Sequence, residues 1–125
     1  MNALPVQKDF PCTNEGLCAA QAFLEQYQED PKPAIIVDEI VSNIVRCSGA
    51  TGFSIRFDQA DGNFVMTFSD DGIAFDPTRE IATPDVTAPL EERQIGGLGM
   101  FMVRKMSKSV VYARQGDHNI LTVTL

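Results

Sequence analysis

The first cluster of residues that could do chemistry lies in an apolar stretch, residues 34–49. Glu39, Asn43 and Arg46 recur there at helical spacing. At about 100° per residue, all three lie along one border of the apolar stripe. An amide oxygen suits a hard cation such as Mg²⁺, and a carboxylate one turn away can accept a proton from an attacking hydroxyl. The same residues also fit the ordinary polar edge of an amphipathic helix. Taken alone, the cluster favours this second interpretation.

The second cluster is the segment DDGIAFDP, residues 70–77, which follows the alternating apolar stretch FVMTFS. A carboxylate at the end of a strand, here Asp70, can accept an N–H from the edge of a nucleobase. Gly72 lets the backbone come close to such a base because it has no side chain. A simple acidic turn is the alternative interpretation.

The third cluster is IGGLGMFMVRK, residues 95–105, in which glycines lead into an apolar helical pattern. Free N–H groups and the dipole at a helix start attract phosphate. The glycines, which would let a phosphate approach the backbone, are Gly96, Gly97 and Gly99. A flexible hinge is the alternative, because a glycine cluster alone is weak evidence. Arg93 to Gly116 contains five basic residues and no acidic one, which fits an anion site and a solvated helix face equally well.

Hydrophobic periodicity predicts the elements that position these clusters. We expect helices at 13–28, 34–49 and about 98–107, strands at 53–57 and 64–69, a C-terminal hairpin made of SVVYARQ and NILTVTL, and a short strand near 6–10. Thr13 or Asn14 caps the first helix, DPKP at 30–33 ends it, and Gly49 caps the second. The fold class is then α+β: a two-layer sandwich with an antiparallel or mixed sheet and helices on one face.

Composition restricts the function further. The 125 residues form one domain, 44% are hydrophobic, and the net charge of −7 argues against nucleic acid or an anionic membrane as the main partner. There is no apolar run of membrane-spanning length and no signal-peptide pattern. Three cysteines without metal-ligand spacing predict reduced thiols in a cytoplasmic protein. The single histidine, His118, falls in a hairpin turn and is expected at the surface.

The ordered combination of the three clusters is more specific than any one of them. Glu-x-x-x-Asn on a helix, Asp-x-Gly after a strand and Gly-x-x-Gly opening a helix resemble the ATP-binding domain of gyrase, the ninety-kilodalton heat-shock chaperone, histidine kinases and MutL (the Bergerat, or GHKL, fold). DDGIAFDP and GGLGMFMVRKMSKSVVYAR look most like its anti-sigma-factor serine kinase branch. The resemblance covers roughly residues 10–125.

The resemblance implies a role for each matching residue. Asn43 would coordinate the Mg²⁺ that bridges the phosphates, and Glu39 would be the general base. Asp70, with Gly72, would bind the adenine amino group, and the segment 77–95 would be the ATP lid. The remaining expected ATP-binding positions are Arg46, Ala74, Gly96, Gly97, Leu98, Gly99, the Met100 amide and, on the adenine side, Asn119. Ala74 stands where the family often has a second glycine, and Cys47 where this branch often has histidine.

The acceptor can be argued chemically. A neutral histidine is already a nucleophile, whereas a serine hydroxyl benefits from a base, so Glu39 favours a hydroxyl or water. The first hypothesis is therefore a Mg-ATP-dependent protein-serine kinase that phosphorylates a small anti-anti-sigma (STAS-like) protein and binds a sigma factor. The second is a binding module gated by ATP or ADP without phosphotransfer, and the third is an interaction domain with a decayed site. A homodimer stays open, because the family often forms one.

Overall fold

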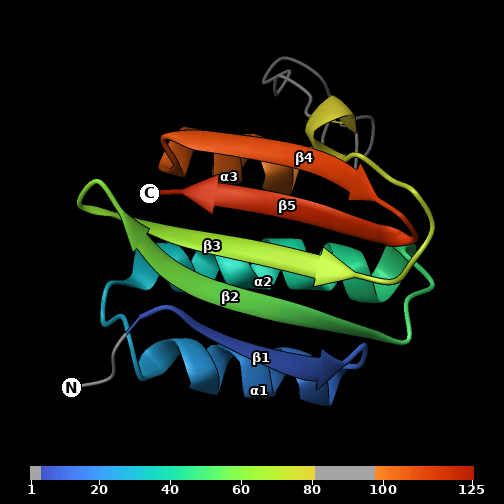
Figure 1. Ribbon diagram of the computed structural model, residues 1–125, viewed down its shortest axis with the longest axis horizontal. Helices are drawn as coiled ribbons and strands as arrows, with labels where there is room; N and C mark the ends of the chain where they lie inside the picture. The colour runs from blue at the N-terminus through green and yellow to red at the C-terminus, as the bar shows by residue number, and fades with distance from the viewer. Residues whose placement is uncertain (1–3, 81–97) are drawn as a thin grey trace, which may run out of the picture.

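The computed structural model describes residues 4–80 and 98–125 of the chain. Figure 1 shows the strands and helices of this part in chain order. The elements are β1 (Val6–Pro11), α1 (Asn14–Glu25), α2 (Pro31–Cys47), β2 (Gly52–Ala60), β3 (Asn63–Asp70), the short 3₁₀ helix η1 (Pro77–Glu80), α3 (Leu98–Met106), β4 (Ser109–Gln115) and β5 (His118–Thr124).

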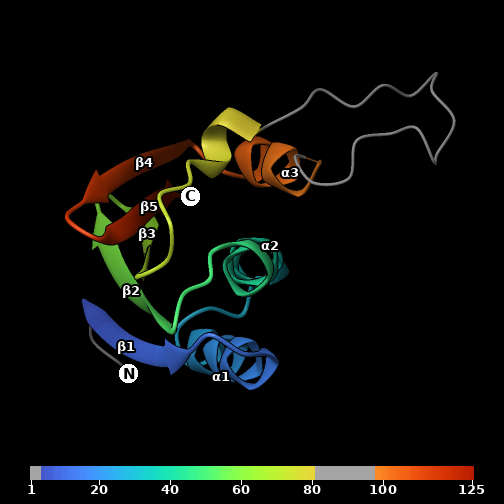
Figure 2. The ribbon, with the colours of Figure 1, turned by 90° about the vertical axis from the view of Figure 1, so that its right-hand side faces the viewer.

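The five described strands form one sheet in the order β1-β2-β3-β5-β4, and every neighbouring pair is antiparallel. Figure 2 shows the second layer: α1, α2 and α3 all lie on the same side of this sheet. The predicted α+β two-layer sandwich is therefore confirmed. The sheet is antiparallel throughout the described strands, so the mixed alternative does not hold for them.

The core lies between the two layers and follows the alternation of the strands. Phe53, Ile55 and Phe57 of β2 are buried, as are Met66 and Phe68 of β3. Each points to the helix side because successive side chains of a strand alternate between faces. Apolar side chains of α1, α2, α3 and β5 complete one continuous cluster.

The helix starts obey local capping rules, with one correction. Thr13 caps α1 by accepting a hydrogen bond from the Gly16 N–H at 3.0 Å. The DPKP segment does not stop a helix but starts one: Asp30 accepts from the Lys32 N–H, and α2 begins at Pro31. Proline suits the first position of a helix because its missing N–H would have no partner there. The predicted start of the second helix at residue 34 is therefore wrong.

The helix ends are also slightly displaced from the predicted positions. Helix α1 ends at Glu25 rather than at residue 28, and α3 ends at Met106 rather than at 107. The C-cap of α2 is Ser48, and Gly49 is the next residue, with φ of +66°. Residues with a side chain rarely adopt that backbone conformation, so glycine suits the turn that follows the helix.

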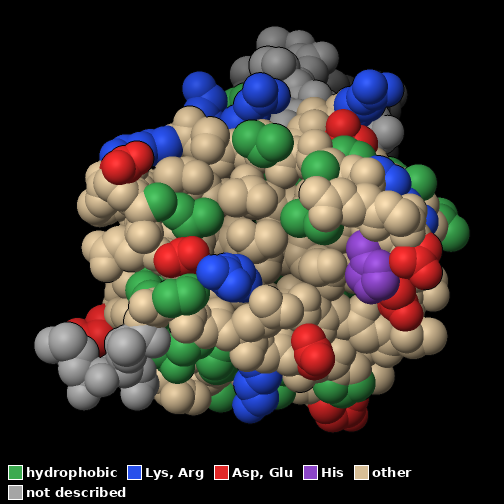
Figure 3. All heavy atoms as spheres, in the orientation of Figure 1, with side chains coloured by type: hydrophobic (Ala, Val, Ile, Leu, Met, Phe, Trp, Pro, Cys, Tyr) green, Lys and Arg blue, Asp and Glu red, His purple; other side chains and the backbone are tan. Residues whose placement is uncertain are grey.

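The face of the sheet away from the helices is open to solvent. Figure 3 shows this face, on which acidic, basic and apolar side chains are interspersed without one sign of charge dominating. His118 lies exposed at one end of the sheet, 2.9 Å from the Asp117 carboxylate, so the expected surface position is confirmed. Among the described residues, no helix is long and apolar enough to cross a membrane.

Candidate functional site

A pocket lies between the sheet and the helices α2 and α3. About 460 Å³ of space free of protein atoms, part of it open solvent, lies within the pocket. Most of its wall is apolar, and the fewer polar groups come from four elements and a loop. Those polar residues are Asn43 and Ser48 at the end of α2, Asp70 of β3, Tyr112 of β4 and Asn119 of β5.

Asp70 forms the polar floor of this pocket. It is the last residue of β3 and is only 6% exposed. Its Oδ1 accepts two hydrogen bonds, from the Gly72 N–H at 2.9 Å and from Asn119 Nδ2 at 3.0 Å. No buried side-chain oxygen or nitrogen of the described residues lacks a partner. Since both bonds use Oδ1, Oδ2 is the oxygen that a ligand can reach.

Gly72 is required by the packing of the loop that follows Asp70. The next N–H, of Ile73, donates to the Ser48 carbonyl at 2.9 Å and ties the loop to the end of α2. A methyl group on Gly72 would lie 2.5 Å from that carbonyl oxygen and 2.9 Å from Asp70 Oδ1. Atoms do not approach that closely without displacement, so the loop can hold this path only with glycine.

Ala74, where the family often has glycine, causes no strain. Among the described residues, Asp61 is the only non-glycine with a positive φ. Ala74 therefore adopts an ordinary backbone conformation, which alanine reaches without cost. The departure from the family pattern does not deform this loop.

On α2 the three predicted polar residues lie along one border, as the spacing predicted. Asn43 lines the pocket, and its Oδ1 accepts a hydrogen bond of 2.6 Å from the Arg46 guanidinium. Arg46 itself is exposed and does not line the pocket. Arg46 therefore influences the pocket indirectly, through its hydrogen bond to Asn43.

Glu39 lies one turn before Asn43 and contacts α3. A methyl group on Gly99 would lie 1.8 Å from Glu39 Oε2 and 2.4 Å from its Cδ. The carboxylate is therefore packed directly against the Gly99 Cα, at the second residue of α3. The first N–H groups of a helix have no partner within the helix, and the positive end of the dipole favours a negative charge there. Glycine at position 99 makes room for that charge.

The remaining predicted residues are only partly within the described structure. Met100 is buried and lines the same pocket as Asp70. Gly99 and Met100 belong to the first turn of α3, which starts at Leu98. Gly96 and Gly97 lie outside the described residues. So does most of the predicted lid, of which residues 77–80 form η1.

Three residues of the site escaped the sequence analysis. Tyr112 donates its hydroxyl hydrogen to Asn119 Oδ1 at 2.6 Å. Arg114 donates to the Gly72 carbonyl at 2.9 Å, and Ser48 is buried with its carbonyl bound to the loop. Of these three, only Tyr112 gave a signal in the sequence, as a tyrosine on the inward face of a predicted strand. Such a residue usually belongs to the hydrophobic core, with its hydroxyl bound to a nearby polar group.

Two groups near the site, the Asp71 carboxyl and the Cys12 thiol, have shifted pKa values. Asp71 accepts hydrogen bonds from the Thr51 hydroxyl, the Thr51 N–H and the Gly52 N–H, and these lower its pKa. Burial raises the pKa of the Cys12 thiol, and the charges of Asp70 and Asp71 raise it further, while a hydrogen bond with Ser48 opposes them. Cys12 thus stays a neutral thiol at neutral pH.

Comparison with known proteins agrees with this arrangement. Residues 16–125 match the family described as the histidine kinase-like ATPase domain. The chain belongs to this family. Membership of an ATPase family implies that the domain binds ATP. Among curated proteins, the serine/threonine-protein kinase BtrW of Bordetella bronchiseptica is 28% identical over 94 residues, which are 72% of this chain and 66% of that protein, just under two thirds of its length.

The histidine kinase AdeS of Acinetobacter baumannii has a similar structure. The superposition has a TM-score of 0.59 at 16% identity and covers 98% of this chain and 68% of the AdeS chain. At that identity the likeness concerns the fold alone. It supports the two-layer α+β fold of Figure 2.

Proposed function

We propose that this domain is a Mg-ATP-dependent protein-serine kinase of the anti-sigma type. It transfers the γ-phosphate of ATP to a serine of a small anti-anti-sigma partner and also binds a sigma factor. The observation that carries the proposal is the position of Glu39, whose carboxylate lies against Gly99 at the start of α3. A base at this point is where an attacking hydroxyl needs one if the phosphates lie at that helix start.

The proposed roles divide along the pocket. At one end, Asp70 Oδ2 accepts a hydrogen bond from the 6-amino group of adenine. Gly72 and Ala74 shape the loop there, and Asn119 lies on the same side of the pocket. At the other end, backbone N–H groups of the first turn of α3 bind the phosphates. The N–H groups of that turn are those of Leu98, Gly99 and Met100, and the preceding Gly96 and Gly97 add theirs. Phosphoryl transfer then depends mainly on positioning and on neutralising charge.

The residues at the phosphate end fit a magnesium ion that is held mostly by phosphates. Mg²⁺ in such sites keeps several waters and takes only one or two protein oxygens. Asn43 offers its Oδ1, of which the Arg46 hydrogen bond uses one of two acceptor positions. Among the described residues, no group of three acidic, His or Cys side chains could hold a metal alone. When bound, the ion would neutralise charge on the phosphates.

A hydroxyl acceptor agrees with the presence of a base. Glu39 is half-buried and contacts the α3 start, so it can accept a proton only from a group that reaches that point. A serine hydroxyl loses a proton when it is phosphorylated, whereas a neutral imidazole attacks with a free lone pair. The kinase name of BtrW, which specifies serine and threonine, supports the same acceptor.

The test is phosphate transfer from ATP labelled at the γ-phosphate to the small anti-anti-sigma proteins of the same genome. We expect the Glu39→Gln variant to transfer at least about 100-fold more slowly, because general-base catalysis contributes that much. Asp38→Asn is the matched control, since Asp38 is the preceding residue and is exposed. Equal rates for wild type and Glu39→Gln would refute the assignment of the base.

Calorimetric titration with Mg-ATP and Mg-ADP separates the proposal from its alternatives. Binding of both nucleotides without transfer to any partner would favour a nucleotide-gated binding module. Failure to bind either one would refute both nucleotide functions and leave an interaction domain with a decayed site.

A further inference from the structure

We infer that Tyr112 and Asn119 are positioning residues that set the base specificity of the pocket by fixing the carboxylate of Asp70. This inference rests on the proposed ATP site and assigns a role to a side chain, Tyr112, to which the sequence analysis gave none. The pair reaches Asp70 from the two C-terminal strands, β4 and β5.

The carboxamide of Asn119 has no hydrogen-bonding capacity left for a ligand. Its Nδ2 donates twice, to Asp70 Oδ1 at 3.0 Å and to the Ile73 carbonyl at 2.7 Å. Its Oδ1 accepts twice, from the Phe75 N–H at 3.2 Å and from the Tyr112 hydroxyl at 2.6 Å. A carboxamide has two N–H donors and two acceptor positions. Asn119 therefore acts on a nucleotide through its neighbours.

These four bonds determine which way the amide points. The Phe75 N–H can only donate, so it requires the oxygen of Asn119 on its side, and the Tyr112 hydroxyl donates to the same oxygen. The nitrogen is thereby turned toward Asp70, where it engages Oδ1 together with the Gly72 N–H. One oxygen of Asp70 is saturated, and the other is presented to the pocket in a defined direction.

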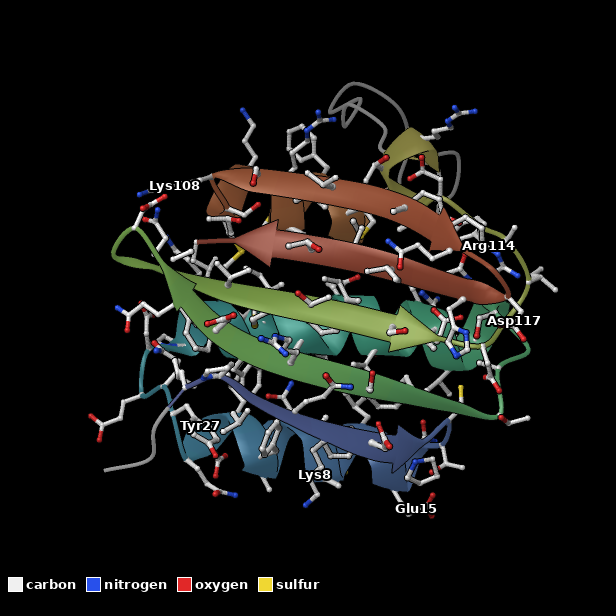
Figure 4. The ribbon with its side chains drawn as sticks, viewed as in Figure 1. Lys8, Glu15, Tyr27, Lys108, Arg114 and Asp117 are labelled. Atoms are coloured by element: carbon white, nitrogen blue, oxygen red, sulfur yellow. The ribbon has the colours of Figure 1, made fainter. Side chains whose placement is uncertain are left out.

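A side chain of β4, Arg114, also binds the loop that follows Asp70. Arg114 lies opposite Asn119 in the register of β4 and β5, and it donates to the Gly72 carbonyl at 2.9 Å and to the Gly116 carbonyl at 3.2 Å. Figure 4 shows Arg114 at the end of the sheet where these two strands meet. The loop from Asp70 to Phe75 is thus fastened to β4 and β5 at both of its ends.

A fixed carboxylate oxygen selects for a donor. The 6-amino group of adenine can donate to Asp70 Oδ2, whereas the 6-oxo group of guanine would set an acceptor against a negative charge. Sites built to hydrogen-bond a substrate N–H reject analogues that lack it, because the buried acceptor is left without a partner. If the carboxylate could rotate freely, this discrimination would weaken.

The experiment compares two ligands on two variants by titration calorimetry. The ligands are ATP and purine riboside triphosphate, which has hydrogen in place of the 6-amino group. Tyr112→Phe removes one hydroxyl and keeps the ring that lines the pocket. The matched control is Tyr27→Phe, the only other tyrosine of the chain, which packs among the rings of Phe23 and Phe57 beside α1 (Figure 4).

For Tyr112→Phe we expect ATP to bind about 5- to 10-fold more weakly, as for loss of one hydrogen bond, while the analogue binds as it does to wild type. Tyr27→Phe should change neither affinity. Unfolding midpoints recorded on the same samples check that both variants fold. Equal weakening of both ligands, or no weakening of ATP, would overturn the inference. Wild type that fails to bind ATP would overturn the proposed function and this specificity role with it.

Discussion

Substitution of Gly99 by alanine tests the contact between the start of α3 and Glu39. The added methyl group would lie 1.8 Å from Glu39 Oε2, whereas real contacts of this kind are essentially never shorter than 3.0 Å. The carboxylate must therefore retreat by more than about 1 Å. Glu39 is a flexible side chain and only half-buried, so it can do this by rotating, at a cost of about 0.5–1.5 kcal/mol.

Alanine also stabilises a helix relative to glycine, by up to about 1 kcal/mol. In wild type the two effects nearly cancel, so Gly99→Ala should change the free energy of unfolding by less than about 1 kcal/mol. In a Glu39→Ala background the obstacle is absent, and the same substitution should stabilise the protein by up to about 1 kcal/mol. An Asp38→Ala background is the control, in which Gly99→Ala should behave as in wild type.

The assay is denaturant unfolding of the single and double variants, which needs neither nucleotide nor partner. The coupling between Gly99 and Glu39 is the difference between the two effects of Gly99→Ala. If the substitution changes stability equally in the Glu39→Ala and wild-type backgrounds, the contact does not exist in solution. Phosphate transfer adds a second measure: a catalytic group displaced by about 1 Å can lose about 100-fold in rate, so Gly99→Ala should transfer slowly while folding normally.

Three further outcomes follow from the site. Gly72→Ala should destabilise the protein by about 1–3 kcal/mol in denaturant unfolding, as overpacking against backbone does, and should weaken ATP binding. Cys47 is exposed and lines the pocket, so Mg-ATP should slow its alkylation, measured by mass spectrometry, and leave the exposed Cys18 of α1 unaffected. The pKa of Asp71 is lowered in the folded state, so its contribution to stability is present above about pH 4 and is lost as pH falls through the lowered value. Thr51→Val should raise that pKa in an NMR titration, and an unchanged value would contradict the stated cause.

The elements of the fold could be predicted because their signals are local. Alternating phenylalanines predicted β2, and the apolar stripe predicted α2. The one substantial error concerned DPKP, whose prolines resemble a stop. Whether proline ends or begins a helix depends on the chain after it, and here Asp30 supplies the cap that makes Pro31 a start.

The candidate site could be predicted only in part, because its hydrogen bonds connect distant segments. Asp70 and Asn119 are 49 residues apart and meet because β3 pairs with β5. The Tyr112 hydroxyl reaches Asn119 only through the register of β4 on β5. No pattern within one segment contains that information. Gly72 and Gly99 could likewise be predicted only in part. The sequence predicts that space is needed at each glycine, but not whether a ligand or another group of the protein fills that space.

The two ends of the pocket must therefore contribute differently to nucleotide choice. ATP and ADP share the adenine that we assign to Asp70, so the end of the pocket fastened by Tyr112 cannot tell them apart. Any preference must arise where we place the γ-phosphate, beside Glu39 and Gly99, because a carboxylate there opposes an added negative charge unless a cation or backbone N–H groups offset it. Tyr112→Phe should then weaken ATP and ADP by the same factor. Glu39→Gln should change their ratio, and a ratio that both variants leave unchanged would contradict this division of the pocket.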